Sequence, residues 1–177
     1  MKNLKLKYFL PVVITIVFVI FFSQLLKKDV TKLSSQLIEK PVPTFNMPTL
    51  LNDNQSFSTI DVIASDIALV NIWSSWCIPC RSEHEILMLL SKIEGIDLYG
   101  INYKDKEDNA LDFINKLGNP FKKIGVDNNG RSSMVWGVYG IPETFIIHKG
   151  TVIYKHIGPI HMNELEETIL PILGDIL

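Results

Sequence analysis

Cys77 and Cys80 are the only two cysteines of the 177-residue chain, and they lie three positions apart. They follow the apolar run Ile67–Trp73 and come at the start of a segment whose apolar residues have helical spacing. A Cys-x-x-Cys pair at a helix start lets two thiols close a small ring, and the helix N-terminus favours thiolate over thiol. Cysteines this close cannot join distant parts of a fold, so they indicate redox chemistry rather than a scaffold.

The order of the two cysteines assigns a role to each. Cys77, at or just before the helix start, is expected to be an exposed nucleophile with a pKa below the ordinary value of about 8.5. Cys80, one turn further and facing the core, is expected to resolve the mixed disulfide that Cys77 forms with a substrate. Pro79 has no N–H to donate and suits the first helical turn. Trp76 is expected to pack beside the dithiol and shield it.

The elements that must position this pair follow from hydrophobic periodicity. The predicted strands cover residues 67–73, 97–103, 121–126, 144–148 and 151–156. The predicted helices cover residues 79–93, 107–117, 131–136 and 162–173, the last distorted at Pro171. A hairpin of residues 45–50 and 55–57 precedes them. Strands that alternate with helices predict an α/β sheet covered on both faces.

The first forty residues predict a membrane attachment. Residues 8–26 are long and apolar enough to cross a bilayer. Lysines lie on both sides, at positions 2, 5, 7, 27, 28 and 32, so the charge bias that places residues 1–7 in the cytoplasm is weak. A removable signal peptide has the same outline, but residues 21–33 contain no small-x-small cleavage site. We expect an uncleaved single-pass anchor, a tether over residues 27–40 and a folded domain over residues 41–177.

Composition and motif counts limit the partners. The chain has 17 Lys and Arg against 19 Asp and Glu and no charge run, so nucleic acid is not an expected partner. A zinc module using Cys77, Cys80 and His84 is an alternative, but one Cys-x-x-Cys supplies half of the usual four ligands. Arg81 stands where a heme-attachment motif requires histidine. No metal or cofactor is expected, and the histidines are expected to be surface or packing residues: His84, His148, His156 and His161.

Two separated motifs carry a resemblance to a known superfamily. Trp76-Cys77-Ile78-Pro79-Cys80 after a buried strand, with Ile141-Pro142 before a later one, resembles the thioredoxin superfamily over residues 41–177. The resemblance implies a thioredoxin-like fold with a central mixed sheet flanked by helices. It also implies a cis peptide before Pro142, whose flanking backbone pairs with a bound substrate chain. The alternative is an ordinary trans proline in a turn.

A finer resemblance is to the cytochrome c maturation thiol:disulfide interchange proteins, the CcmG/DsbE family. It rests on four segments, residues 70–73, 80–84, 100–105 and 137–145. It implies a bacterial inner-membrane protein whose periplasmic domain reduces the heme-binding cysteines of apocytochrome c. Electrons would come from a membrane thiol reductant of the DsbD/CcdA type.

Three other functions remain open from the sequence. One is another tethered thioredoxin-like reductase, such as those serving copper-site assembly of cytochrome oxidase or spore-coat maturation. The second is an oxidase that introduces disulfides. The third is a binding domain in which the disulfide between Cys77 and Cys80 is permanent.

One departure from ordinary thioredoxins concerns proton transfer. Asn71 occupies the strand position at which thioredoxins carry a buried aspartate, so another group must exchange a proton with Cys80. The resemblance to the maturation family implies Glu83 and Glu143 as the candidates, one following the second cysteine and the other following Pro142. A partly buried carboxylate near the dithiol would have a raised pKa and would disfavour a nearby thiolate. The alternative for Glu83 is a solvated residue stabilised by the helix dipole. Tyr139 is either a rim residue that contacts substrate or a core aromatic.

Overall fold

The computed structural model describes residues 3–26, 37–51 and 55–177, and the chain divides into two units at Ser34 and Ser35. The first unit contains one helix, α1 (Asn3–Leu26), whose side chains are described for residues 11–23. Among the described residues, no helix combines the length and the hydropathy needed to cross a bilayer. Most of the expected tether, residues 27–36, lies outside the described residues.

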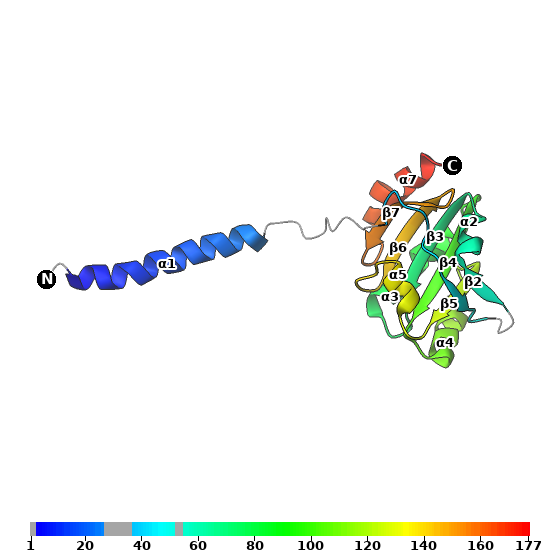
Figure 1. The fold of residues 1–177 in the computed structure, drawn as a ribbon, viewed down its shortest axis with the longest axis horizontal. Helices are drawn as coiled ribbons and strands as arrows, with labels where there is room; N and C mark the ends of the chain where they lie inside the picture. The colour runs from blue at the N-terminus through cyan, green and yellow to red at the C-terminus, as the bar shows by residue number, and fades with distance from the viewer. Residues whose placement is uncertain (1–2, 27–36, 52–54) are drawn as a thin grey trace. The chain divides into compact units, whose positions relative to one another are not determined.

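The second unit is built on a five-stranded sheet with the order β5-β4-β3-β6-β7 (Figure 1). Its strands are β3 (Ile67–Trp73), β4 (Ile96–Tyr103), β5 (Lys123–Asp127), β6 (Glu143–His148) and β7 (Thr151–Ile157). The strands β3, β4 and β5 are parallel to one another, whereas β6 runs antiparallel to β3 and to β7. The expected mixed sheet is therefore confirmed. Residues just before Pro41 also bond to the sheet, since the Glu39 N–H donates to the Val152 carbonyl of β7.

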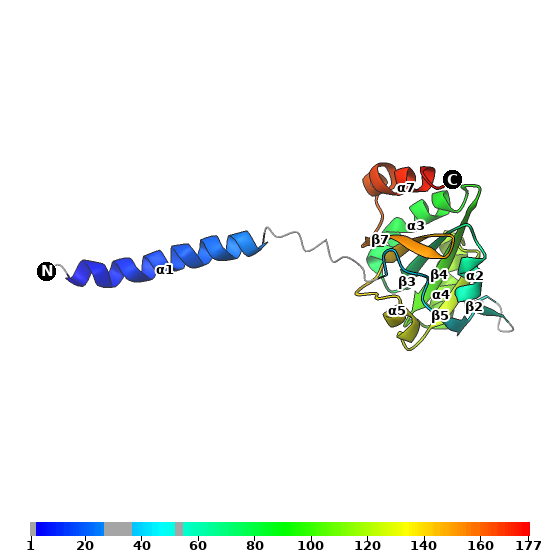
Figure 2. The ribbon, with the colours of Figure 1, turned by 45° about the horizontal axis from the view of Figure 1, so that its top comes forward.

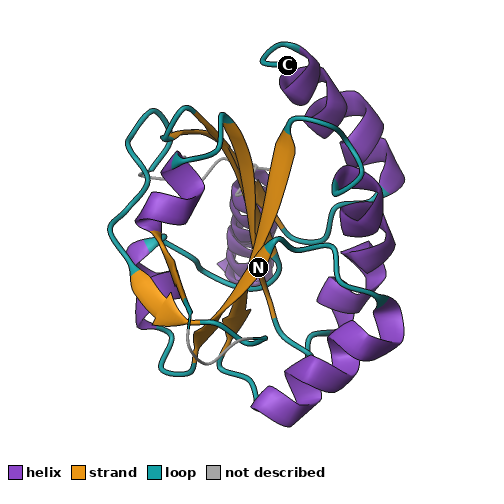
Figure 3. Cartoon of the chain, turned by 90° about the vertical axis from the view of Figure 1, so that its right-hand side faces the viewer, coloured by secondary structure: helices purple, strands orange, loops and turns teal. Residues whose placement is uncertain are grey.

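Helices cover both faces of this sheet (Figure 3). They are α2 (Thr59–Ile63), α3 (Ile78–Leu90), α4 (Glu107–Leu117), α5 (Arg131–Val135), α6 (Met162–Glu164), the π-helix η1 (Leu165–Ile169) and α7 (Leu170–Gly174). The helices α3 and α4 and the C-terminal helices share one hydrophobic core, and Figure 2 shows α7 beside α3. The opposite core includes residues of α2 and of the hairpin of β1 (Asn46–Pro48) and β2 (Ser56–Ser58).

The central strand β3 is buried at every position and divides its side chains between the two cores. Ala68, Val70 and Ile72 belong to the core under the hairpin, whereas Leu69 and Trp73 belong to the core under α3. Because side chains alternate along a strand, Asn71 faces the α3 side. The fold thereby places a polar side chain of the central strand directly beneath the helix that carries the dithiol.

Two local expectations differ from the structure. The helix α2 was not predicted, although Ser58 and Asp61 give it an N-terminal signal: the Ser58 N–H donates to the Asp61 carboxylate over 2.8 Å. The C-terminal helix is not distorted at Pro171 itself, because the irregularity is η1, which ends before it. Pro171 has no N–H for the carbonyl of the preceding turn, so that turn adopts a wider hydrogen-bond register.

Candidate active site

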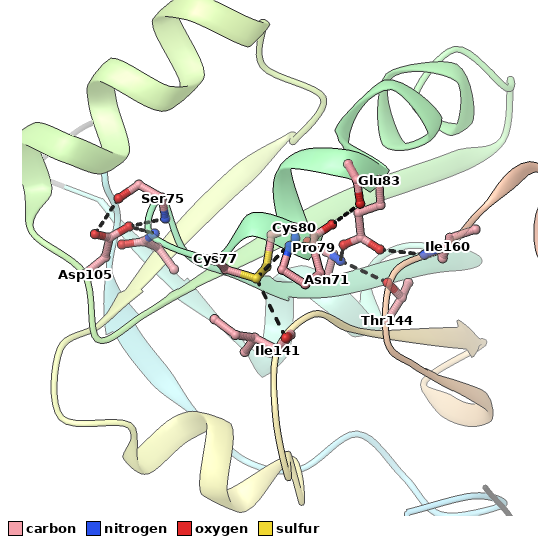
Figure 4. Close-up of a disulfide and its surroundings, with 12 residues drawn as sticks. Asn71, Ser75, Cys77, Pro79, Cys80, Glu83, Asp105, Ile141, Thr144 and Ile160 are labelled. Carbon is pink, nitrogen blue, oxygen red and sulfur yellow. Dashed lines mark hydrogen bonds between the residues drawn. A yellow bond between two sulfur atoms is a disulfide. The ribbon is translucent and has the colours of Figure 1, made fainter.

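The dithiol lies where β3 gives way to α3, and the two cysteines form a disulfide (Figure 4). Cys77 is the N-cap residue of α3, with an extended backbone. Its Sγ accepts a hydrogen bond from the Cys80 N–H at 3.1 Å. Pro79 lies in the first turn of α3, where its missing N–H costs no helical hydrogen bond. The geometry supplies one N–H donor and the positive end of a helix to a thiolate at Cys77.

The expectation that Cys77 is exposed is wrong for this disulfide form. Its exposed fraction is 4%, close to the 2% of Cys80. The reason is tertiary: the Ile141 carbonyl oxygen lies 3.7 Å from the Cys77 Sγ. The peptide bond between Ile141 and Pro142 is cis, as the resemblance implies. A substrate cysteine that reaches Cys77 must therefore approach beside this segment.

The turn that leads into Cys77 is held by Asp105. The carboxylate of Asp105 accepts hydrogen bonds from the Ser75 N–H at 2.6 Å and from the Ser75 hydroxyl at 2.8 Å. It also accepts one from the Asn102 side chain at 3.0 Å. Burial acts to raise the pKa of Asp105, but the hydrogen bonds from Ser75 and Asn102 outweigh it, so the pKa lies below its usual range. Asp105 thus fixes the backbone just before the nucleophile as a charged acceptor.

Glu83 lies fully buried between α3 and the sheet (Figure 4), so the solvated alternative is wrong. Its Oε1 accepts from the Asn71 Nδ2 at 2.8 Å, and its Oε2 accepts from the Ile160 N–H at 2.9 Å. The Asn71 amide also donates to the Thr144 hydroxyl at 3.0 Å. Burial raises the pKa of Glu83 to about 7, and the hydrogen bonds from Ile160 and Asn71 only partly oppose it.

A carboxyl group with a pKa near neutrality suits proton exchange with a thiol. Glu83 follows Cys80 by three positions in α3, so the two side chains lie on the same face of the helix. The groups that bond Glu83 are neutral, and they leave the carboxyl free to change its charge. Asn71, where thioredoxins carry an acid, therefore acts here as a partner of the acid rather than as a replacement for it.

Glu143 has a different environment. It is fully buried, and its Oε2 pairs with the Lys155 Nζ at 2.9 Å. Its Oε1 accepts from the Tyr139 N–H at 3.0 Å. The buried side chain of Glu143 is therefore bonded on one oxygen by the Lys155 ammonium and on the other by a loop N–H. These contacts suit Glu143 to fixing the segment around Pro142, whereas the contacts of Glu83 suit it to proton exchange.

The two aromatic candidates both lie at the surface. Trp76 is 56% exposed, and its indole N–H donates to the Lys104 carbonyl at 3.1 Å. It lies beside the dithiol in sequence, but with more than half of its surface in solvent it is a poor shield. Tyr139 is 64% exposed, so the core alternative is wrong, and contact of Tyr139 with substrate stays a prediction.

The histidines take packing and surface positions, as expected. His84 is buried, with its Nε2 at 3.0 Å from the Gly118 carbonyl and its ring edge against Phe113. His148 and His156 are half-buried and His161 is exposed. In the part of the chain that the structure describes, no three His, Cys, Asp or Glu side chains are grouped to hold a metal ion.

Sequence reasoning missed four residues that complete the site: Asp105, Thr144, Lys155 and Ile160. Asp105 had a weak signal, since it follows a predicted strand beside the segment that carries the dithiol. Lys155 had none, because a lysine in a strand near the chain's end is ordinarily exposed. Ile160 contributes only its backbone N–H, which side-chain patterns cannot reveal.

Comparison with known proteins agrees with this geometry. Residues 38–169 match the Redoxin family. The chain belongs to that family. It is 38% identical over 150 residues to the thiol:disulfide interchange protein DsbE of Allochromatium vinosum, which covers 84% of this chain and 82% of that protein.

A second relative agrees with this family, and a solved structure at lower identity shows the same fold. The chain is 46% identical over 116 residues to the thiol:disulfide interchange protein CycY of Rhizobium leguminosarum, covering 65% of this chain and 62% of that protein. The crystal structure of a DsbF homologue from Corynebacterium diphtheriae superposes with a TM-score of 0.62 at 24% identity, over 75% of this chain and 86% of that one. With Cys77 and Cys80 at the start of α3, this Redoxin-family protein is a thiol:disulfide oxidoreductase.

Proposed function

We propose that this protein is a membrane-anchored protein-disulfide reductase that reduces the heme-binding cysteines of apocytochrome c in the bacterial periplasm. The likeness to DsbE over 82% of that protein's length supports the assignment. In this proposal residues 8–26 anchor the chain in the inner membrane, residues 1–7 lie in the cytoplasm, and residues 41–177 form the periplasmic domain. The helix α1 spans Asn3–Leu26 and so includes the residues that this proposal assigns to the anchor.

The observation that carries the thiol-exchange mechanism is the buried carboxyl of Glu83 on the same helix face as Cys80, and the likeness to DsbE favours the reducing direction. The Cys77 thiolate attacks one sulfur of the substrate disulfide, forming a mixed disulfide and releasing the other substrate sulfur as a thiolate. Cys80 passes its proton to Glu83 and attacks the Cys77 sulfur. The bond to the substrate breaks, the Cys77–Cys80 disulfide closes, and two electrons have moved to the substrate.

The cycle then needs a dithiol to reduce Cys77–Cys80 again, and we propose a membrane thiol reductant of the DsbD/CcdA type as its donor. The same steps run in reverse during this exchange, with Glu83 returning the proton to Cys80. The cycle uses the protein's own thiols and carboxyl together with two thiol partners. The partly exposed Trp76 and Tyr139 offer the surface at which both partners are selected.

Trapping tests the client. Cys80→Ala removes the resolving thiol, so mixed disulfides accumulate on Cys77 and their partners are identified by mass spectrometry. Cys77→Ala is the matched control, because it keeps one thiol but removes the nucleophile. We expect apocytochromes c joined through a cysteine of their Cys-x-x-Cys-His motif. Copper-site assembly proteins in their place would favour the other tethered reductases, and the absence of any specific partner would contradict both.

The reduction potential tests the direction of the reaction. A reductase needs a dithiol that gives up electrons readily, so equilibration with glutathione should leave the protein oxidised over a wide range of glutathione ratios. A strongly oxidising potential would instead identify a protein that introduces disulfides. A disulfide that resists reduction altogether would indicate the inert binding domain.

A further inference from the structure

Lys155 places a buried ammonium beneath the segment that precedes β6. Its side chain is 1% exposed. The Nζ donates to the Gly137 carbonyl at 2.8 Å, pairs with the Glu143 Oε2 at 2.9 Å and lies 4.5 Å from the centre of the Tyr139 ring. These three contacts reach the beginning, the middle and the end of residues 137–143, which we call the cis-proline loop.

The loop is also tied to itself through the same ion pair. The Glu143 Oε1 accepts from the Tyr139 N–H at 3.0 Å, so Glu143 joins Lys155 to the loop backbone. Separating a buried ion pair leaves a charge without its partner, which is far more costly than losing a surface contact. The loop therefore cannot shift away from β7 without breaking this pair.

The position of the loop determines what Cys77 can meet. Ile141 lies between Tyr139 and Glu143, and its carbonyl oxygen is 3.7 Å from the Cys77 Sγ. The other side of the loop is fixed to the end of β7, where the Gly158 N–H donates to the Pro142 carbonyl at 2.9 Å. A polypeptide whose disulfide approaches Cys77 must lie along the backbone of residues 139–141, whereas a small disulfide has little chain to place there.

We propose that Lys155 is a positioning residue for polypeptide substrates. By holding the cis-proline loop through Gly137, Tyr139 and Glu143, it sets the distance between Ile141 and Cys77 and keeps the Tyr139 ring at the surface. Lys155 does not touch the reacting sulfurs, so its effect depends on the size of the substrate. The inference rests on the oxidoreductase activity of the dithiol and is independent of which client the protein serves.

The test compares two substrates of the reduced full-length protein in detergent micelles. One is a peptide closed by a Cys-x-x-Cys disulfide, and the other is cystamine, a disulfide without a polypeptide chain. In Lys155→Met an apolar chain replaces the ammonium. We expect the ratio of the peptide rate constant to the cystamine rate constant to fall about tenfold, which is within the range that small positional errors cost. The loss should appear as a higher half-saturating peptide concentration rather than as a lower limiting rate.

Two further variants make the result decisive. Lys155→Met alone leaves Glu143 unpaired and can impair folding, so Lys155→Met/Glu143→Gln removes both charges together. The double variant should show the same fall in the ratio. The control is Lys123→Met, which breaks another ion pair of the domain, the one between Lys123 and Asp61, whose side chains are partly exposed. The control should keep the wild-type ratio.

An unchanged ratio in the double variant would overturn the proposal and leave Lys155 with a purely structural role. An equal fall in Lys123→Met would overturn it as well, because the effect would then follow general stability. A wild-type protein that reduces neither disulfide would instead contradict the oxidoreductase assignment, so the two failures are distinguishable.

Discussion

Replacing Glu83 by glutamine should change how the stability of the domain depends on pH. The glutamine keeps the shape and one acceptor oxygen but cannot ionise. The two oxygens of Glu83 accept from the Asn71 Nδ2 and the Ile160 N–H, so the NH₂ group of glutamine must face one of these two donors. The Asn71 amide can turn to accept from glutamine, since its Oδ1 has no hydrogen-bond partner in the described residues. We therefore expect Glu83→Gln to fold.

The magnitude follows from the pKa of Glu83. Burial raises this pKa from an ordinary 4.5 to about 7. At a pH between these two values, Glu83 is protonated in the folded protein and ionised in the unfolded chain. The contribution of Glu83 to stability is fully present below pH 4.5 and is lost as pH rises through about 7. The difference between about 7 and 4.5 is about 2.5 pH units. At about 1.4 kcal/mol per unit, wild type loses roughly 3 kcal/mol over this range.

The assay is urea unfolding of the full-length protein in micelles at pH 5, 6, 7 and 8, followed by tryptophan fluorescence. The quantity compared is the difference in free energy of unfolding between Glu83→Gln and wild type. The lowered pKa of the buried His84 acts on both proteins and cancels in this difference. The difference should shift in favour of Glu83→Gln by about 2 to 3 kcal/mol from pH 5 to pH 8. A difference that stays constant within about 0.5 kcal/mol would falsify the raised pKa and the proton-exchange role built on it.

The remaining predictions concern the turn and the thiol beside Glu83. Asp105→Ala should lower the free energy of unfolding at pH 7 by about 1 to 3 kcal/mol, because the partly buried Ser75 N–H and the Asn102 amide lose a charged acceptor. Urea unfolding measures this change, and an effect below about 0.5 kcal/mol would contradict the assigned role. In the reduced protein, iodoacetamide should alkylate Cys77 with a midpoint below pH 8.5 or so, because the Cys80 N–H and the α3 N-terminus stabilise its thiolate. A midpoint at or above that value would contradict the N-cap argument.

The main elements of the sheet could be predicted because their signals are local. The continuous apolar run of β3 and the helical spacing of α4 gave the observed bounds, Ile67–Trp73 and Glu107–Leu117. The predicted ends of a strand were less accurate where pairing with an adjacent strand sets them: β5 begins at Lys123 rather than at Phe121. The short helix α2 was missed because five residues carry too little periodicity to register.

The surroundings of Glu83 and Glu143 could not be predicted from local patterns. Glu83 accepts a hydrogen bond from the N–H of Ile160, which is 77 residues away in the sequence, and Lys155 donates to the carbonyl of Gly137, which is 18 residues away. Such pairings depend on how α3, β6 and β7 pack together, which no local pattern encodes. The two glutamates look alike in the sequence, yet one is bonded by neutral groups and the other by an ammonium.

The sequence by itself determined the reaction: two cysteines three apart at a strand-to-helix junction, a proline before a later strand, and the order of strands and helices around them. These features are local, because thiol spacing and backbone periodicity need no knowledge of the partner elements. Only the tertiary structure decided that Cys77 is covered by Ile141, that Glu83 is fully buried and that Glu143 is paired with Lys155. Burial and charge pairing arise where distant elements pack, and they set the pKa values and positions on which the dithiol depends.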